Sequence, residues 1–425
     1  MFTVIALCAI GAEKVLANEL RKLGFSITDS HPGRLRYQTD LGGMYRSLFM
    51  LRTADRLLLE AGRYEAQDFD ALYEGARNIP WENYLPRSRP IVVSKVHSAH
   101  SRLTAITSIQ SVVHKALADR LCTLWKVRRL PETGDPISLR VYVEKDQVQI
   151  LLDITGEPLF KRGYRQEGGV APLRETTAAA MLLLSGWRRK FPLYDPFCGS
   201  GTILIEAALY AWEIPPGLGR TFVLSQLPFG APSLEESLRK ELKAVIRTDI
   251  PLYIQGSDKE KSAVEGARHN LERALQLIHR PVEGDHPSTV SVAKLPTFRR
   301  CSIEELRSGE EQGFLITNPP YGERLGTQEE AEALYRLFGQ QVPHFAGWKL
   351  AVITTHPGFE SHFGYRATSV RKITNGALPS IIYLYDSLPE GVSREAPPAQ
   401  NKSPRFSENV KKPYTGASYV HYRGT

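Results

Sequence analysis

The sequence predicts an α/β protein in which two small α/β units precede a larger domain with a mostly parallel sheet. The first unit follows from a β-α-β-β-α-β order over residues 1–65, which is typical of a ferredoxin-like fold. The larger domain follows from strands that alternate with helices from Phe191 onward, because such alternation produces a parallel sheet covered by helices. A chain of 425 residues is long enough for two or three domains.

The period of the apolar residues predicts the elements of the two small units. In the first unit we expect, in order, a strand at 3–9, a helix at 13–23, strands at 25–28 and 34–38, a helix at 41–51 and a strand at 56–63. In the second unit, residues 66–155, we expect a helix at 69–77, a strand at 90–96, a helix at 104–121 and strands at 137–143 and 147–154. Residues 156–175 are rich in glycine and proline, which predicts a linker.

The larger domain is expected over residues 176–390. Its elements are, in order, a strand ending near 195, a helix at 201–212, a strand ending near 258, a helix at 260–279, strands near 290–295 and 314–317, a helix at 329–342, a strand near 349–354 and two late strands near 370 and 381. Residues 213–251 form an insertion between the first helix and the second strand. The tail, residues 391–425, is rich in Pro, Ser, Asn and Lys, which predicts a flexible end.

The charge of the chain is distributed unevenly. Residues 1–165 carry a net charge of +6, residues 166–390 carry −2 and residues 391–425 carry +4, against +8 for the whole chain. A basic front half favours a polyanionic partner, and simple solubility is the alternative explanation. The four cysteines are far apart and form no Cys-x-x-Cys pair, which favours reduced thiols in the cytoplasm and no metal site. No apolar run approaches 18 residues, so we expect no membrane span.

The first motif with chemical content is Asp-Pro-Phe-Cys-Gly-Ser-Gly-Thr at residues 195–202, between a strand and a helix. Gly199 and Gly201 let the backbone turn sharply and approach a ligand closely. The following helix N-terminus offers free N–H groups to an anionic group. The motif lacks the spacing of a P-loop and of a Gly-x-Gly-x-x-Gly dinucleotide site. A tight turn that binds nothing is the alternative.

The second and third motifs follow the next strands of the same domain. Asp258, in Gly-Ser-Asp at a strand end, is suited to accept ribose hydroxyls, and it can also cap the following helix. Asn318 begins Asn-Pro-Pro-Tyr after an apolar strand. Its side-chain carbonyl and a nearby main-chain carbonyl offer two acceptors to a planar NH₂ group, and Tyr321 offers a flat face for stacking a base. A proline-fixed loop with a packing tyrosine is the alternative.

Together the three motifs resemble those of the class I S-adenosylmethionine-dependent methyltransferases. The resemblance implies a Rossmann-like domain with a mostly parallel seven-stranded sheet and S-adenosylmethionine as cofactor. Enzymes with Asn-Pro-Pro-Tyr methylate adenine N6, guanine N2 or glutamine amides, so the tetrapeptide does not choose among these substrates.

Further segments resemble the THUMP-domain RNA methyltransferases, over about residues 1–390. They are residues 153–157, 161–165, 171–176 and the extended motif 318–326. The chain is most similar to the bacterial 23S rRNA guanine-N2 methyltransferases in their single-methyltransferase form. The resemblance implies a THUMP-like RNA-binding domain over residues 66–155 and structured rRNA, or tRNA, as the partner.

The resemblance also implies roles for individual residues. The target base would be held by Asn318, Pro319, Pro320 and Tyr321. The cofactor would be bound by Arg174, Glu175, Thr176, Asp195, Pro196, Phe197, Cys198, Gly199, Ser200, Gly201, Thr202, Asp258 and Ser302. Ser302 is a departure, because the family usually has an acidic residue near the adenine; Ser302, Glu304 or a backbone group is expected to serve there.

The basic residues of the front half are expected to contact RNA phosphates without specifying bases. They are His97, Arg102, Lys115, Arg120, Lys126, Arg128 and Arg129. Two alternatives to an rRNA guanine-N2 methyltransferase stay open. One is a tRNA guanine-N2 or adenine-N6 methyltransferase. The other is an RNA-binding assembly factor without catalysis. The oligomeric state is not predicted.

Overall fold

The computed structural model describes residues 1–165, 173–278, 294–320 and 327–390, which fold around two seven-stranded sheets. The strands of the N-terminal sheet are β1 (Phe2–Cys8), β2 (Ile27–His31), β3 (Arg34–Thr39), β4 (Ala54–Glu65), β5 (Ile91–Ala99), β6 (Ile137–Glu144) and β7 (Gln147–Asp153). The helices of this part are α1 (Glu13–Lys22), α2 (Leu41–Met50), α3 (Phe69–Asn78) and α4 (Ile106–Trp125), with a 3-10 turn η1 at Trp81–Asn83. The β-α-β-β-α-β order expected for the first unit is present.

One continuous sheet joins the two N-terminal units. Its strand order is β2-β3-β1-β4-β7-β6-β5. Strand β4 pairs with β1 through residues 54–59 and with β7 through residues 58–65, antiparallel in both cases. The backbone hydrogen bonds of this 12-residue strand therefore tie the ferredoxin-like unit to the second unit.

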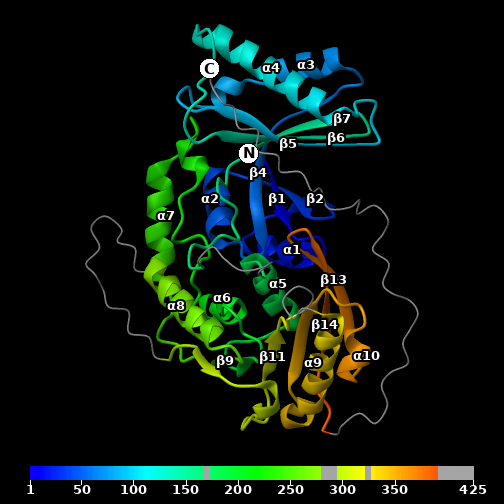
Figure 1. The fold of residues 1–425 in the computed structure, drawn as a ribbon. Helices are drawn as coiled ribbons and strands as arrows, with labels where there is room; N and C mark the ends of the chain where they lie inside the picture. Colours follow the sequence, from blue (N-terminus) through cyan, green and yellow to red (C-terminus); the bar gives the residue numbers. More distant parts are fainter. Residues whose placement is uncertain (166–172, 279–293, 321–326, 391–425) are drawn as a thin grey trace, which may run out of the picture.

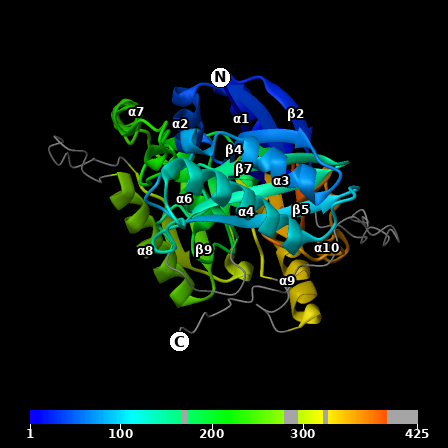
Figure 2. The same ribbon diagram turned by 90° about the horizontal axis from the view of Figure 1, so that it is seen from above.

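The helices α1 to α4 pack on one face of this sheet. Side chains alternate between the faces of a strand, and Leu35, Leu57 and Leu139 belong to the main core together with residues of the four helices. The neighbouring positions Arg36 and Leu58, which both pair with Ile5, lie on the opposite face. Figure 1 shows α3 and α4 along the outer side of β5, β6 and β7, and Figure 2 shows them lying across those strands.

The C-terminal sheet has the order β10-β9-β8-β11-β12-β14-β13. Its strands are β8 (Leu193–Asp195), β9 (Ile254–Asp258), β10 (Thr297–Arg300), β11 (Phe314–Thr317), β12 (Lys349–Thr354), β13 (Ser369–Asn375) and β14 (Leu378–Tyr385). The helices are α5 (Glu175–Ser185), α6 (Thr202–Ala211), α7 (Pro232–Ala244), α8 (Lys261–Ile278), α9 (Gln328–Gln341) and α10 (Phe359–Phe363), with 3-10 turns η2 (Val223–Gln226), η3 (Ile303–Glu305) and η5 (Val342–Phe345). β8 to β12 are parallel, and β14 is antiparallel to both its neighbours. The mostly parallel seven-stranded sheet is confirmed.

Several elements differ from the sequence-based expectation. Helix α5 was not expected, because its residues are buried from Glu175 to Leu182, polar and apolar alike, and it therefore lacks an amphipathic period. The third strand of the C-terminal sheet was expected near 290–295 and lies at β10 instead, where Phe298 is buried. Residues 279–293 and 391–425 lie outside the described residues. Strand β5 continues to Ala99, so His97 lies in a strand and not in a loop.

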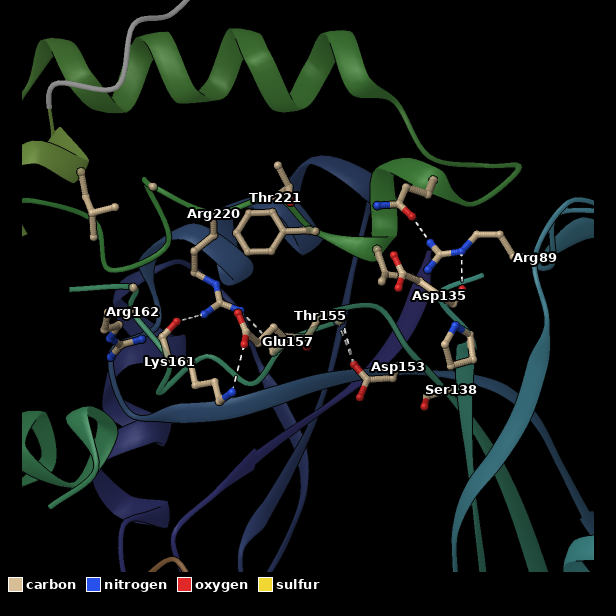
Figure 3. A pocket seen from close by; sticks show the side chains of 18 residues that line it. Arg89, Asp135, Ser138, Asp153, Thr155, Glu157, Lys161, Arg162, Arg220 and Thr221 are labelled. Atoms are coloured by element: carbon tan, nitrogen blue, oxygen red, sulfur yellow. Dashed lines mark hydrogen bonds and ion pairs between the residues drawn. The ribbon is translucent and has the colours of Figure 1, made fainter. Parts of the chain in front are cut away.

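The described part of the expected linker, residues 156–165, is packed against both halves of the molecule. Leu159 and Tyr164 are buried within the main core. Arg220, from the insertion, donates hydrogen bonds to the carbonyl oxygens of Lys161 and of Pro158, the latter at 2.9 Å. Figure 3 shows Arg220 over this segment, beside a cavity of about 580 Å³. These contacts fix the direction in which the chain enters the C-terminal domain.

Among the described residues, the model contains no helix with the length and apolar character that a membrane span needs.

Candidate active site

The loop that follows β8 turns sharply into α6 at two glycines. Gly199 and Gly201 have φ angles of +48° and +79°, which residues with a Cβ rarely adopt. A Cβ on Gly201 would lie 3.0 Å from the Cβ of Ala267. The motif therefore produces a tight loop whose backbone passes close to the N-terminus of a helix.

Asp258 ends β9 beside that loop, and two backbone N–H groups orient its carboxylate. Gly199 N–H donates to Oδ2 and Glu260 N–H donates to Oδ1, each at 3.0 Å. Each carboxylate oxygen keeps a further lone pair, and Asp258 lines a cavity of about 820 Å³. The side chain therefore caps the helix start and can also accept hydroxyl groups of a ligand.

The cavity lies at the carboxyl ends of the parallel strands, which is where open α/β sheets bind ligands. Seven of the site residues expected from the sequence line its wall. They are Pro196, Phe197 and Gly199 after β8, Asp258 after β9, Ser302 after β10, and Asn318 and Pro320 after β11. Its volume suits a single small-molecule ligand. The structure therefore brings residues of all three sequence motifs to one site.

Asn318 lines this cavity and carries an unsatisfied acceptor. The residue is only 8% exposed, and among the described residues its Oδ1 has no hydrogen-bond partner. Buried polar atoms without a partner are rare in native proteins, so this oxygen is placed to receive an N–H group from a ligand. Pro319 is buried beside it and Pro320 lines the cavity. Tyr321 lies outside the described residues.

Asp195 lies beneath the loop and not on the cavity wall. It is 1% exposed and accepts hydrogen bonds from the Thr317 hydroxyl at 2.5 Å and from Phe197 N–H at 3.1 Å. Burial raises the pKa of its carboxyl to about 7. Because Thr317 directly precedes Asn318, Asp195 ties the loop after β8 to the loop that carries the unsatisfied acceptor.

The raised pKa of Asp195 predicts a loss of stability as the pH rises. The folded protein holds this proton up to about pH 7, whereas the unfolded chain releases it near its ordinary pKa of 3.8. Between these values the free energy of unfolding should fall by up to about 1.4 kcal/mol per pH unit from this group. In Asp195→Asn the thermal midpoint should depend less on pH over about pH 4–7, and two parallel curves would contradict the assignment. Glu175, whose pKa is also raised to about 7, is present in both proteins and cancels.

The remaining residues of the first motif hold the loop in shape. Cys198 N–H donates to the Ser257 carbonyl at 2.9 Å, and burial raises the pKa of the Cys198 thiol. The Ser200 carbonyl accepts from Asn270 at 2.8 Å, and the Ser200 and Thr202 hydroxyl oxygens are 3.2 Å apart. These residues hold the loop after β8 in place, and they do not belong to the cavity wall that the described residues form.

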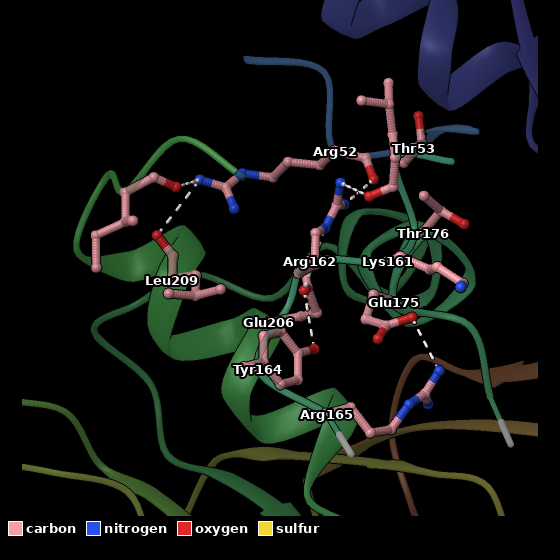
Figure 4. A network of polar contacts seen from close by, with 12 residues as sticks. Arg52, Thr53, Lys161, Arg162, Tyr164, Arg165, Glu175, Thr176, Glu206 and Leu209 are labelled. Atoms are coloured by element: carbon pink, nitrogen blue, oxygen red, sulfur yellow. Dashed lines mark hydrogen bonds and ion pairs between the residues drawn. The ribbon is translucent and has the colours of Figure 1, made fainter. Parts of the chain in front are cut away.

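Arg174, Glu175 and Thr176 start helix α5 and connect it to other parts of the molecule. Arg174 pairs with Asp55 at 3.2 Å, and the Thr176 hydroxyl donates to Asp55 at 2.6 Å. Glu175 pairs with Arg165 at 3.1 Å (Figure 4). The structure thus places these three expected cofactor residues at the junction with the ferredoxin-like unit, outside the described cavity wall.

The wall after β10 has a carboxylate near the position where the family usually has one. Ser302 precedes η3, and its N–H donates to the Glu305 carboxylate at 3.4 Å. Ser302 and Glu304 both line the cavity, so either can face an adenine. The opposite wall comes from α9, through Ala333, Leu334 and Leu337. The helix itself was expected at 329–342, but no motif indicated that it would line the site.

Three of the expected RNA-contacting residues have partners within the protein. Arg120 donates to both carboxylate oxygens of Glu82, at 2.9 and 2.7 Å. Lys115 Nζ lies 5.9 Å from the centroid of the Tyr73 ring. Arg129 pairs weakly with Glu132 at 3.6 Å, with both side chains exposed.

The other four expected RNA-contacting residues are exposed at two separate places. Lys126 and Arg128 follow the end of α4 on the helical side of the sheet, and Arg102 lies before its start. His97 lies on β5, on the face opposite the helices, because it pairs with Tyr142 two positions from Arg140. The structure therefore separates His97 from the residues around α4.

Glu332, His356 and His362 form a cluster whose geometry resembles a metal site. His356 Nδ1 accepts from Gly358 N–H at 3.1 Å, and His362 Nδ1 faces an Arg336 N–H at 3.0 Å. The Nε2 atom of each ring lies 3.5 Å from Glu332, and His356 Nε2 also lies 3.3 Å from the Gln328 side-chain nitrogen. Both nitrogens of each ring therefore have hydrogen-bonding partners within the protein, and the arrangement favours a hydrogen-bonded cluster.

Removal of the Asp258 carboxylate should weaken cofactor binding. Hydrogen bonds to a charged group contribute about 1.5–3 kcal/mol, so we expect Asp258→Ala to raise the Kd for S-adenosylmethionine by roughly 10–100-fold in calorimetry. The exposed Asp249, paired only with Arg247, is the matched control, and Asp249→Ala should bind like the wild type. A thermal scan checks folding, since Asp258 also orients the loop. Unchanged affinity in a folded Asp258→Ala protein would remove the proposed role.

The fold and the site together define a class of protein. The strand order with β14 inserted antiparallel between β12 and β13, the glycine loop after β8 and the carboxylate after β9 are those of a class I methyltransferase. The cavity fits its cofactor, S-adenosylmethionine, because Asp258 on its wall can hold a ribose. Comparison with known families identifies the chain further. Residues 162–382 match the RMKL-like methyltransferase domain, and residues 3–58 match the RlmL ferredoxin-like domain. The chain belongs to the RMKL-like methyltransferase family.

Two curated relatives differ in length. YpsC of Bacillus subtilis, provisionally named an RNA methyltransferase, is 33% identical over 391 residues, which are 90% of this chain and 96% of YpsC. A ribosomal RNA large subunit methyltransferase K/L of Syntrophotalea carbinolica is 35% identical over 398 residues, which are 88% of this chain and 52% of that protein. The chain therefore spans about half the length of the K/L relatives.

Two solved structures share the fold over nearly the whole chain. SMU.472, described as a methyltransferase in complex with S-adenosylhomocysteine, has a TM-score of 0.80 and 33% identity and covers 91% of this chain and 98% of its own. A Listeria monocytogenes protein, described by inference as an N6-adenine-specific DNA methylase, has a TM-score of 0.80 and 35% identity and covers 90% of this chain and 96% of its own. The S-adenosylhomocysteine bound to SMU.472 supports S-adenosylmethionine as the cofactor. Only the description of the Listeria monocytogenes protein names a substrate, adenine in DNA.

Proposed function

We propose that this protein transfers a methyl group from S-adenosylmethionine to the exocyclic N2 amine of a guanine in RNA, within the large-subunit rRNA. The observation that carries the proposal is the buried, unpartnered Asn318 Oδ1 at the wall of the cofactor cavity. An exocyclic amine has two protons to donate, and a carbonyl acceptor on each would fix its plane. The names of the K/L relatives support rRNA, and the +6 charge of residues 1–165 supports a nucleic acid.

The chain's own groups act by positioning. Asn318 and the Pro319 carbonyl would accept the two amine protons and direct the nitrogen lone pair toward the methyl group. Thr317, fixed by Asp195, holds Asn318 in place. The cofactor supplies a methyl group that is already activated on a sulfonium. With the cofactor bound, the amine would form the new N–C bond as the S–C bond breaks, and the methylated amine would release one proton to water. Most of the rate gain would come from orientation and from a preorganised polar site.

A target base inside a stem must first leave its stack. Extrusion costs a few kcal/mol, and contacts between the N-terminal half and the RNA would offset this cost. Structured RNA is recognised by shape and phosphate contacts more than by groove-edge sequence. We therefore assign the two tasks to different sheets: the N-terminal sheet holds RNA, and the edge of the C-terminal sheet carries out the transfer in the cytoplasm.

The nucleosides of a deletion strain test this proposal. Mass spectrometry of digested rRNA and tRNA should show the loss of N2-methylguanosine from large-subunit rRNA only. Loss from tRNA would move the substrate to tRNA. Unchanged N2-methylguanosine in both RNAs would refute the proposal.

Adenine N6 is a second candidate, favoured by the description of the Listeria monocytogenes structure. In that case the same deletion strain would lose N6-methyladenosine. A non-catalytic assembly factor would change neither nucleoside, and tight binding of S-adenosylmethionine to the pure protein would count against it.

A further inference from the structure

The face of the N-terminal sheet opposite the helices has a distinct surface. Ile5, Leu58 and Leu151 form a small apolar cluster there, separate from the main core, with Leu7 and Tyr142 packed against it. These residues come from the central strands β1, β4, β6 and β7. The apolar strip is therefore narrow, and polar side chains surround it on the neighbouring strands.

The polar side chains around this strip are mainly cationic. A hollow of about 730 Å³ is lined by Arg34, Arg56, Lys95, Arg140 and Arg174, against the carboxylates Asp55 and Glu144, which is a net charge of +3 for these groups. A third carboxylate, the buried Asp153, pairs with two arginines: Arg56 at 2.6 Å and Arg140 at 3.8 Å. With Asp153 included, the five cations of this face still outnumber its carboxylates by two.

Two of the cationic positions are available to a ligand. Arg34 pairs with Glu144 at 3.2 Å, but the Glu144 side chain is 46% exposed, and exposed pairs contribute little. Lys95 is exposed and has no ion pair among the described residues. The pKa of the neighbouring His97 is lowered by burial first and then by Arg34 and Lys95. This shift agrees with a positive potential over β3, β5 and β6.

An aromatic ring lies in the middle of these cations. The Arg34 guanidinium carbon is 5.2 Å from the centroid of the Tyr142 ring, and the His97 ring is 6.1 Å away on the adjacent strand. Tyr142 is partly exposed. Because the Arg34 guanidinium lies over this ring, a nucleobase can stack on Tyr142 once Arg34 turns toward a phosphate.

The hollow ends where the methyltransferase domain begins. Its far wall is formed by Pro158, Phe160 and Arg174, with the Arg174 guanidinium 4.3 Å from the Phe160 ring. Arg174 starts α5, and its backbone N–H donates to Asn375 at 3.0 Å. Asn375 ends β13 next to the start of β14, which pairs with the carboxyl end of β12. The hollow therefore opens beside the catalytic edge of the C-terminal sheet.

We propose that this face of the sheet binds a single-stranded RNA segment next to the target nucleotide, with a base stacked on Tyr142 and phosphates near Arg34 and Lys95. This inference rests on the proposed RNA methyltransferase function. It moves the main RNA contact away from the exposed basic residues around α4. It also gives a function to the cationic hollow, which runs from the N-terminal sheet to Arg174 at the start of the methyltransferase domain.

Fluorescence anisotropy with a labelled single-stranded RNA of about 12 nucleotides tests the proposal. Tyr142→Leu keeps an apolar side chain over Ile5 but removes the stacking ring, and it should weaken binding on the order of tenfold. Lys95→Gln and Arg34→Gln should each weaken binding about threefold and lower the slope of log affinity against log salt by about one. A duplex of the same length should compete poorly.

The matched controls are Tyr253→Leu and Lys240→Gln, which alter exposed residues of the insertion and its flank. They should bind RNA like the wild type. All variants should bind S-adenosylmethionine normally and have wild-type thermal midpoints. If the wild type methylates RNA while the Tyr142, Lys95 and Arg34 variants bind and methylate it equally well, this inference is wrong and the proposed function stands. If the wild type methylates no RNA, the proposed function fails first.

Discussion

Asn318→Ala should reduce kcat for methyl transfer by about 10²–10³-fold while leaving the affinity for S-adenosylmethionine unchanged. The Asn318 oxygen is buried and has no partner among the described residues, and the residue lines the cofactor cavity. Loss of one preorganised polar group of this kind costs about 3–4 kcal/mol in a transition state. Single-turnover methylation of large-subunit rRNA with labelled cofactor would measure the effect.

The control for this prediction is Asn18→Ala, an exposed asparagine on α1 that accepts only from Arg21. It should retain the wild-type rate. A second variant, Asn318→Leu, keeps roughly the size of the side chain but removes the acceptor, so a loss in Asn318→Ala that reflects only altered packing should be absent from it. An Asn318→Ala protein that binds cofactor and methylates at nearly the wild-type rate would rule out the positioning role.

Glu206→Ala should lower the thermal midpoint by about 10 °C, because it leaves a buried arginine unpaired. Glu206, on α6, is fully buried and lies 3.5 Å from Arg162 and 3.0 Å from the Tyr164 hydroxyl, which donates to it. Arg162 also donates to the Arg52 carbonyl at 2.5 Å, and Arg52 donates to the Ile214 carbonyl at 2.5 Å (Figure 4). This network joins the N-terminal sheet, the entering segment and the catalytic domain.

The cost expected from breaking such a buried pair is about 3–5 kcal/mol. The matched control is Glu213→Ala, which breaks the exposed Arg189–Glu213 pair at 2.8 Å. Exposed pairs contribute about 0–1 kcal/mol, so the control should unfold near the wild-type temperature. Equal midpoints for the two variants, measured by scanning calorimetry at one scan rate, would show that the buried network does not hold the domains together.

The local features of this protein could be predicted from the sequence because their determinants are contiguous. The glycine loop after β8 needs Gly199 and Gly201, on either side of Ser200, in one turn, and both have positive φ. Asp258 and Asn318 follow apolar strands, and parallel strands bring their carboxyl ends to one edge. Three separate motifs therefore converge on one cavity.

The features that depend on distant pairing could not be predicted in the same way. The pairing of β4 with β7 joins residues about ninety positions apart and merges two units into one sheet. Helix α5 has no polar face because it is buried between other elements, so its sequence lacks the period of a surface helix. The burial of Asp195 under its own loop depends on Thr317, which lies 122 positions away.

The basic residues illustrate the same limit for function. The sequence does not show which acidic residue an arginine will pair with. Arg120, expected to contact RNA, donates to Glu82 instead. Tyr142 belongs to no sequence motif. Its position between Arg34 and His97 depends on the folded sheet, in which side chains of β3, β5 and β6 share one face. Charge alone therefore points to one half of the chain and not to a particular surface.

The identity of the methylated nucleoside tests the proposed function most directly. Purified protein would be incubated with methyl-labelled S-adenosylmethionine and unmodified large-subunit rRNA, and the RNA digested to nucleosides for mass spectrometry. The proposed function predicts label in N2-methylguanosine, and none when Asn318→Ala replaces the wild type. Label in N6-methyladenosine, or no label in RNA from a protein that binds the cofactor, would contradict it.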